Sequence, residues 1–169
     1  MEHKINQVVG INIVNVEYPH NKTKMRFYKA TNNLYRIQNV IKNDKVKKFD
    51  VVNCQFALHY FFKNDKTLKN FISNVNENLK TNGILVTTFI DGNSLLRKLD
   101  NNKYKSNIVE IKVGKINDKL TGNKVSVSLK GTKYFKQGKS NEYIVKTEQF
   151  IKLMNTTGFS VIENVQFSK

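Results

Sequence analysis

The sequence has little of three residue types that often carry chemistry or shape. It holds one cysteine, one proline and three arginines among 169 residues. Cys54 cannot form an internal disulfide or hold a metal ion alone, which excludes a cysteine-rich scaffold and a zinc finger. The longest nearly apolar stretches, such as Ile84–Ile90, are too short to cross a membrane. No charged segment followed by an apolar one opens the chain, so we expect no secretion signal.

The sequence does have enough apolar residues for a core. It is 39% hydrophobic, which argues against wholesale disorder, and its length suits one domain. The formal net charge is +16, and 26 of the 29 basic residues are lysines. Two explanations of the high lysine content stay open. One is a coding bias, because lysine shares A/T-rich codons with asparagine, of which the chain has 24. The other is binding to a polyanion, which would also favour positive charge.

The positive charge is concentrated in one part of the chain. Residues 97–139 hold 12 basic and three acidic residues, a net charge of +9. A basic segment of this kind suits a phosphate backbone. Because lysine dominates over arginine, we expect phosphate contacts without base specificity.

The first 100 residues alternate apolar runs with segments of helical spacing. We expect strands at Gln7–Val14, Arg26–Ala30, Phe49–Cys54 and Ile84–Ile90, and helices at Asn33–Lys42, Asp65–Leu79 and Asn93–Leu99. Asn82-Gly83 is expected to end the middle helix, and Asn93 or Ser94 to cap the next one. The alternation predicts a parallel, doubly wound α/β sheet, in which ligands bind beyond the carboxyl ends of the strands.

Residues 107–146 follow a different pattern. Strands are expected at Ile108–Val113, Val125–Leu129 and Tyr143–Val145, with glycines at the turns between them. A helix at Glu148–Thr156 and a last strand at Phe159–Phe167 complete the expected elements. We therefore expect one domain over residues 1–169, with a basic antiparallel insert at about 105–146.

The most informative stretch is FDVVNCQFALHY, residues 49–60. It resembles the signature of the mRNA cap guanine-N7 methyltransferases, in which an FD-hydrophobic strand runs into a QF-small-x-HY turn. The segments Asn78–Thr88, Asp91–Asn93 and Asn141–Val145 (NEYIV) resemble the elements that follow in the family. The resemblance covers roughly residues 8–167 and is strongest for viral, poxvirus-like members. It implies an incomplete class I, Rossmann-like sheet that is mostly parallel, with helices on both faces and an inserted antiparallel segment.

The resemblance also implies roles for particular residues. Gln55 matches a glutamine beside the S-adenosylmethionine pocket, and Tyr60 an aromatic residue between methyl donor and base. His59 matches a residue that contacts the cap guanine. Glu142 matches a carboxylate that accepts hydrogen bonds from the N1 and N2 edge of guanine, where paired acceptors meet two donors. The implied reaction moves a methyl group from S-adenosylmethionine to N7 of the 5′ cap guanine of mRNA by alignment, with no general base and no metal.

The sequence departs from the family on the cofactor side. The family's first strand and DxGxGxG-like loop find no counterpart before Gln7, and its C-terminal strands none after Phe167. Two family aspartates that contact the cofactor fall at Asn12 and Thr31. We therefore expect a fragment of an enzyme, or a split enzyme completed by a second polypeptide or by other capping subunits.

Two alternatives stay open beside the cap methyltransferase. One is a non-catalytic relative that binds RNA or regulates an enzyme partner, which the net charge of +16 favours. The other is a different class I methyltransferase, since a shared fold does not fix the substrate. No membrane partner is expected. A viral member would act in the cytoplasm, at the virus factory, and a cellular member in the nucleus.

Overall fold

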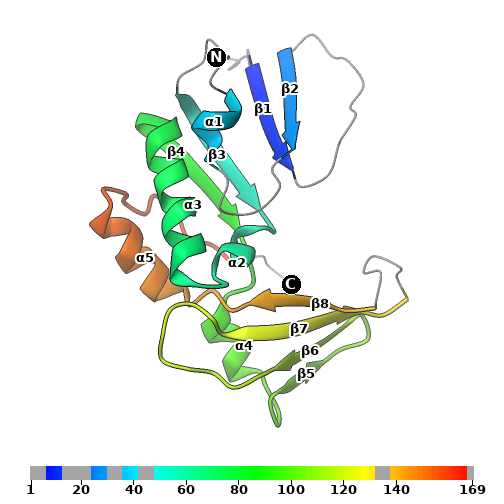
Figure 1. Ribbon diagram of the computed structural model, residues 1–169. Helices are drawn as coiled ribbons and strands as arrows, with labels where there is room; N and C mark the ends of the chain where they lie inside the picture. Colours follow the sequence, from blue (N-terminus) through cyan, green and yellow to red (C-terminus); the bar gives the residue numbers. More distant parts are fainter. Residues whose placement is uncertain (1–6, 13–23, 30–35, 42–47, 132–137, 167–169) are drawn as a thin grey trace.

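Strands of two kinds build the molecule (Figure 1). The computed structural model describes residues 7–12, 24–29, 36–41, 48–131 and 138–166. Two parallel pairs come first, β1 (Gln7–Asn12) with β2 (Lys24–Lys29) and β3 (Phe49–Gln55) with β4 (Leu79–Thr88). An antiparallel sheet follows, in the order β5 (Lys103–Lys105), β6 (Val109–Val113), β7 (Lys124–Leu129) and β8 (Ser140–Tyr143). The expected mixture of a parallel part and an antiparallel part is therefore confirmed.

The main core lies on one face of the β3–β4 pair. Alternation along β3 turns Val52 and Cys54 toward helices α2 (Leu58–Phe61), α3 (Asp65–Asn78) and α5 (Thr147–Thr156). The helices and the residue that ends α2, Phe62, contribute the buried apolar residues Leu58, Phe62, Leu68, Phe71, Ile72, Val75, Phe150 and Met154. Burial of this one stripe of each helix is what fixes the helices against the sheet.

The parallel part differs from the expected doubly wound sheet in two ways. The pairs β1–β2 and β3–β4 share no strand-to-strand hydrogen bonds within the described residues, so they form two sheets rather than one. Helices were expected on both faces, but Val51, Ile84 and Val86 on the other face of β3–β4 are 52%, 45% and 39% exposed. A parallel sheet is normally buried on both faces. The described part of the chain supplies neither a strand between the pairs nor a cover for this face.

Helix α3 is held by its ends and by hydrogen bonds that α1 (Ile37–Ile41) donates to Asn74 and Asn78. Asn64 and Thr67 form a reciprocal capping box that satisfies free backbone donors at its start. The expected end at Asn82-Gly83 is wrong, because the chain enters β4 directly at Leu79 in an extended conformation. Asn82 adopts a φ of 61° inside β4, where the pairing with β3 shifts register. Gly83 is needed there for close approach, since a Cβ would lie 2.7 Å from Leu79 Cγ.

Helix α4 (Gly92–Arg97) connects the two parts of the fold. Its N-cap is Asp91, and the expectation of Asn93 or Ser94 is wrong, because the Asp91 carboxylate accepts from both of their backbone N–H groups. The Gly92 N–H donates to the Val145 carbonyl at 2.8 Å. The Leu95 side chain of α4 then packs under the antiparallel sheet in a second core with Ile111, Val113, Val125, Val127 and Ile144.

The antiparallel strands match the sequence expectations in part. β6 and β7 lie where they were expected, but β8 begins at Ser140 instead of Tyr143. Its partners on β7 are Lys124–Val127, and Val145 instead forms a bridge with Asp91. The expected last strand at Phe159–Phe167 is wrong for residues 159–166, which pair with no strand in the described part of the chain. Ile162 and Val165 there are 80% and 74% exposed.

Candidate functional site

A sharp turn carries the chain from β3 into α2. Phe56 has a φ of 50°, and its N–H donates to the carbonyl oxygen of Thr88 at 2.9 Å, which ties the turn to the end of β4. Leu58 follows and is fully buried in the main core. The next residue, His59, therefore projects from a short helix that is anchored on both sides.

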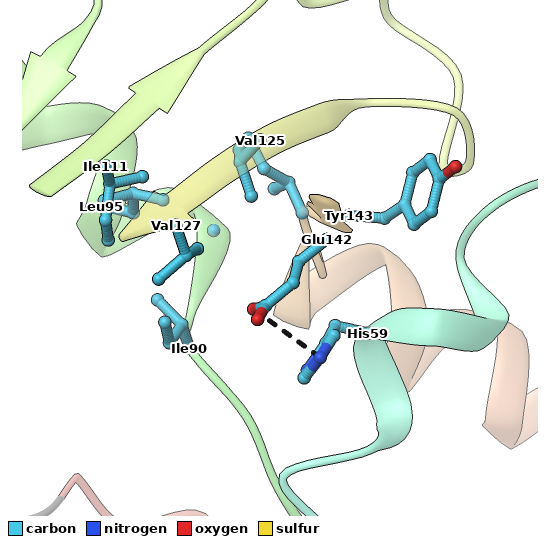
Figure 2. Close-up of a pocket in the computed structure, with 10 residues that line it drawn as sticks. His59, Ile90, Leu95, Ile111, Val125, Val127, Glu142 and Tyr143 are labelled. Carbon is cyan, nitrogen blue, oxygen red and sulfur yellow. Dashed lines mark ion pairs between the residues drawn. The ribbon is translucent and has the colours of Figure 1, made fainter. Parts of the chain in front are cut away.

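His59 lies opposite Glu142 of β8, as Figure 2 shows. The His59 Nε2 atom lies 3.5 Å from the Glu142 Oε2 atom, and the two side chains are 13% and 12% exposed. Both line a narrow pocket whose other walls are mainly apolar: Ile90, Gly92, Leu95, Ile111, Val125, Val127, Tyr143 and Ile144. The fold thus brings two polar side chains from distant segments to one apolar pocket.

The ring nitrogen of His59 is an unusual feature of this pocket. Nε2 is buried, and it makes no hydrogen bond with the residues that the structure describes. Buried polar atoms are nearly always hydrogen-bonded, and those that are not often mark functional sites. The contact with Glu142 is long, so it brings the carboxyl group near the His59 ring without forming a hydrogen bond.

Burial shifts the protonation equilibria of both side chains. Burial lowers the pKa of His59 below 6.5 and raises the pKa of Glu142 above 4.5, the latter opposed by a hydrogen bond with the Ser140 side chain. A lowered pKa leaves the imidazole neutral near pH 7. The pocket therefore combines a neutral imidazole with a partly desolvated carboxyl group, which suits hydrogen bonding more than ion pairing.

The lowered pKa of His59 predicts a pH-dependent stability. As the pH falls through 6.5, His59 takes up a proton in the unfolded chain while it stays neutral in the folded chain, so acid favours unfolding. His59→Gln should therefore lessen the fall in the free energy of unfolding below pH 6.5. Urea titrations of both proteins across this range test it, and parallel pH profiles would contradict it. Glu142 acts oppositely, since its raised pKa disfavours the folded state as the pH rises above 4.5.

Of the other residues expected at the site, some lie near the pocket and others do not. The Tyr60 ring lies next to the His59 ring, with 4.1 Å between centroids, and the Tyr60 residue is 41% exposed. Gln55 ends β3 on the uncovered face and is exposed. Asn12 ends β1, and Thr31 lies outside the described residues. His59, Tyr60 and Glu142 are therefore together, while Gln55 and Asn12 end parallel strands in two separate sheets.

Comparison with known proteins places the chain in a family. The sequence profile of the mRNA (guanine-N(7))-methyltransferase domain matches residues 3–169. The chain belongs to this family.

Individual relatives of the cap methyltransferase family match parts of the chain. A mimivirus protein named "Probable mRNA-capping enzyme" is 44% identical over 52 residues, which are 31% of this chain and 4% of the relative. The mRNA cap guanine-N(7) methyltransferase of Caenorhabditis elegans is 25% identical over 134 residues, 72% of this chain and 34% of the relative. The mRNA cap guanine-N(7) methyltransferase of Caenorhabditis briggsae is 30% identical over 98 residues, which are 54% of this chain and 25% of the relative. The chain thus spans about a third or less of these relatives.

The structure also shows site residues of this family member that sequence reasoning missed. Asp91 accepts a hydrogen bond from the Thr147 hydroxyl at 2.5 Å and so joins α4 to α5 near the pocket. Burial raises the pKa of Asp91, but hydrogen bonds from Ser94 and Thr147 outweigh this and leave the pKa lowered. The sequence predicts Val125 and Val127 as strand residues but not as walls of the pocket. Their alternation along the strand nevertheless indicates one buried face.

Several kinds of site are not found among the residues that the structure describes. No three His, Cys, Asp or Glu residues gather in a way that would hold a metal ion. Cys54 lies against the main core, and burial raises the pKa of its thiol to about 11, which keeps it protonated and unreactive. None of the described helices is long and apolar enough to cross a membrane.

Proposed function

We propose that this chain takes part in transfer of a methyl group from S-adenosylmethionine to N7 of the mRNA cap guanine. The single observation that carries the proposal is the meeting of His59 and Glu142 at one pocket in a member of the cap methyltransferase family. Each side chain comes from the segment with the strongest resemblance to that family, the QFALHY turn and the NEYIV strand.

In the proposed site, Glu142 holds the N1 and N2 edge of guanine. A carboxylate offers two acceptors to these two donors, and its partial burial strengthens both hydrogen bonds. The bound base separates Glu142 from His59 and gives the buried His59 Nε2 atom a partner. Tyr60, beside the His59 ring, lies against the base from the side of the methyl donor.

In this proposal, methyl transfer is accelerated by the positioning of the guanine against the methyl donor. Guanine N7 carries a lone pair and needs no deprotonation, so none of these residues acts as a general base. S-Adenosylmethionine, when bound, supplies an activated methyl group. The residues proposed to face it are Gln55, Tyr60, Asn12 and Thr31. Gln55 and Asn12 fit this role because both end parallel strands, the edge at which sheets of this kind bind ligands.

We propose that residues 1–169 form part of one methyltransferase domain with an antiparallel insert at about 105–146, and that a further segment completes its sheet. Two features support this. The pairs β1–β2 and β3–β4 are both parallel but are not joined, and the face with Val51, Ile84 and Val86 is uncovered. One strand followed by one helix would satisfy both features. That segment belongs either to a longer form of this protein or to a second capping polypeptide. A viral form acts in the cytoplasm and a cellular form in the nucleus.

The alternative function is a non-catalytic RNA-binding or regulatory relative, favoured by the net charge of +16. It predicts salt-dependent RNA binding without preference for a capped 5′ end. The cap methyltransferase predicts such a preference, because Glu142 and His59 recognise the guanine. A competition between capped and uncapped RNA of one sequence separates the two functions.

The direct test measures transfer of a tritiated methyl group from S-adenosylmethionine to GpppA-capped RNA. With the completing segment present, we expect label at guanine N7, none on uncapped RNA and none on RNA whose cap already carries the N7 methyl group. Cap binding without transfer by the chain alone would point to the missing cofactor-side segment, and adding that segment should then restore transfer. Absence of cap-dependent binding would contradict the proposal.

A further inference from the structure

One face of the antiparallel sheet carries most of its side-chain charge. Alternation turns Ile111, Val113, Val125 and Val127 toward α4 and the second core, and turns their neighbours to the opposite face. On that opposite face five exposed lysines gather with three polar side chains. We name this set the lysine face: Lys103, Lys105, Lys112, Lys124, Lys130, Ser126, Ser128 and Asn141.

Strand register shows that these residues are neighbours. Lys103 of β5 pairs with Lys112 of β6, Lys112 with Ser126 of β7, and Ser126 with Asn141 of β8. The residues form one row across all four strands. Adjacent strands lie about 4.8 Å apart, so the row spans on the order of 15 Å.

The charge on the lysine face is largely unbalanced. Among the described residues of β5 to β8, the carboxylate on this face is Glu110, whose Oε1 atom lies 3.1 Å from Lys112 Nζ. A hydrogen bond and the charge of Lys112 lower the pKa of Glu110, and the charges of Lys105 and Lys130 add to this. Three ammonium groups are thus close enough to act on one carboxylate, Lys103 lies in the same row as Lys112, and Lys124 lies on the same face of β7. Such a surface attracts a polyanion.

The lysine face and the candidate pocket meet at β8. Asn141 points to the lysine face, and the next residue, Glu142, points from the same strand into the pocket (Figure 2). β8 is the last strand of its sheet. Asn141, at the end of the lysine row, is therefore the direct chain neighbour of the pocket residue Glu142.

We propose that the lysine face binds the sugar–phosphate backbone of the RNA that follows the 5′ cap. This inference rests on the proposed function for the identity of the polyanion. Lysines contact phosphates as point charges and do not read bases, so the binding is independent of sequence. Ser126 and Asn141 add hydrogen-bonding groups for phosphate and ribose oxygens, which favours RNA over an acidic polypeptide, whereas the Ser128 hydroxyl already donates to the Gly138 carbonyl.

A matched pair of triple variants tests the proposal. K103Q/K105Q/K112Q removes three charges from the lysine face, and K66Q/K69Q/K152Q removes three exposed charges from α3 and α5. The probe is a short uncapped single-stranded RNA, titrated by fluorescence anisotropy at several salt concentrations. The first variant should bind about tenfold more weakly or worse, with a log–log salt slope smaller by about 2, because each lost phosphate contact contributes about 0.7. The second should change affinity by less than about threefold.

Equal losses in the two variants would overturn the proposal, because the effect would then follow total charge. Displacement of the RNA by polyglutamate at equal charge concentration would also overturn it and would indicate an acidic protein partner. Binding of the GpppA dinucleotide reports on the pocket separately, and the lysine-face variant should keep it. If the lysine-face variant alone loses RNA affinity but the protein does not bind the cap, the proposed function is wrong and this inference stands. If the protein binds the cap but the two triple variants do not differ in RNA affinity, this inference is wrong and the proposed function stands.

Discussion

Glu142→Ala is expected to weaken binding of a GpppA cap by at least thirtyfold. The Glu142 side chain is 12% exposed, so a bound guanine would face it across little water. Removing one partner of a buried, charged hydrogen-bonded pair costs about 2–5 kcal/mol, and about 2 kcal/mol already corresponds to thirtyfold. Quenching of a fluorescent cap analogue by the protein measures this affinity without requiring methyl transfer.

Three further variants identify the cause of that loss. Glu148→Ala removes an exposed carboxylate from α5 and should leave cap affinity unchanged. Glu142→Gln keeps one acceptor but loses the charge, so its affinity should fall between those of the wild type and Glu142→Ala. His59→Ala should also weaken binding, because it removes the opposite wall of the pocket. Equal cap affinity of Glu142→Ala and Glu148→Ala would exclude a guanine-binding role for Glu142.

Loss of fold is not expected to explain the effect of Glu142→Ala. Burial raises the pKa of Glu142, which means that the charged form destabilises the folded protein near neutral pH. Removing the carboxyl group should therefore leave the melting temperature the same or higher. A lower melting temperature would show that Glu142 contributes to folding and would require the binding data to be corrected for unfolded protein.

Much of the local structure follows from sequence patterns. The apolar runs predicted β1, β3, β6 and β7, and the apolar spacing of Asp65–Leu79 predicted α3 to within one residue. Each of these elements buries one face, and the apolar residues of that face recur along the sequence with the period of a helix or a strand. The turn that follows the Phe49–Cys54 strand was also expected, because the QFALHY motif resembles the turn of the family signature.

Features that depend on distant partners could not be read in the same way. β5 (Lys-Tyr-Lys) carries no apolar run and is a strand because β6 pairs with it. The segment Phe159–Phe167 has an apolar content typical of a strand, yet residues 159–166 have no pairing strand among the described residues. The contact between His59 and Glu142 depends on how α2 docks beside β8, which only the assembled fold determines.

Phe62→Ala should have the largest effect on folding. Phe62 is fully buried, and its ring meets that of Phe150 edge to face, with 5.5 Å between centroids. Truncating a buried phenylalanine to alanine costs about 3–5 kcal/mol through lost contacts and the cavity left behind. Domains of this size are stable by about 5–15 kcal/mol, so the variant should lose a large share of its free energy of unfolding. Urea denaturation followed by circular dichroism measures the change.

The matched control is Phe56→Ala, since Phe56 is 65% exposed and should change stability by no more than about 0.5 kcal/mol. A similar loss in both variants would mean that the core assigned to α2, α3 and α5 is wrong. Phe62 also connects this core to the site, because its carbonyl accepts from the Gly122 N–H at 2.9 Å, just before β7. Folded Phe62→Ala protein keeps this main-chain hydrogen bond but loses the ring that holds the His59 helix in the core, so it should bind the cap less tightly.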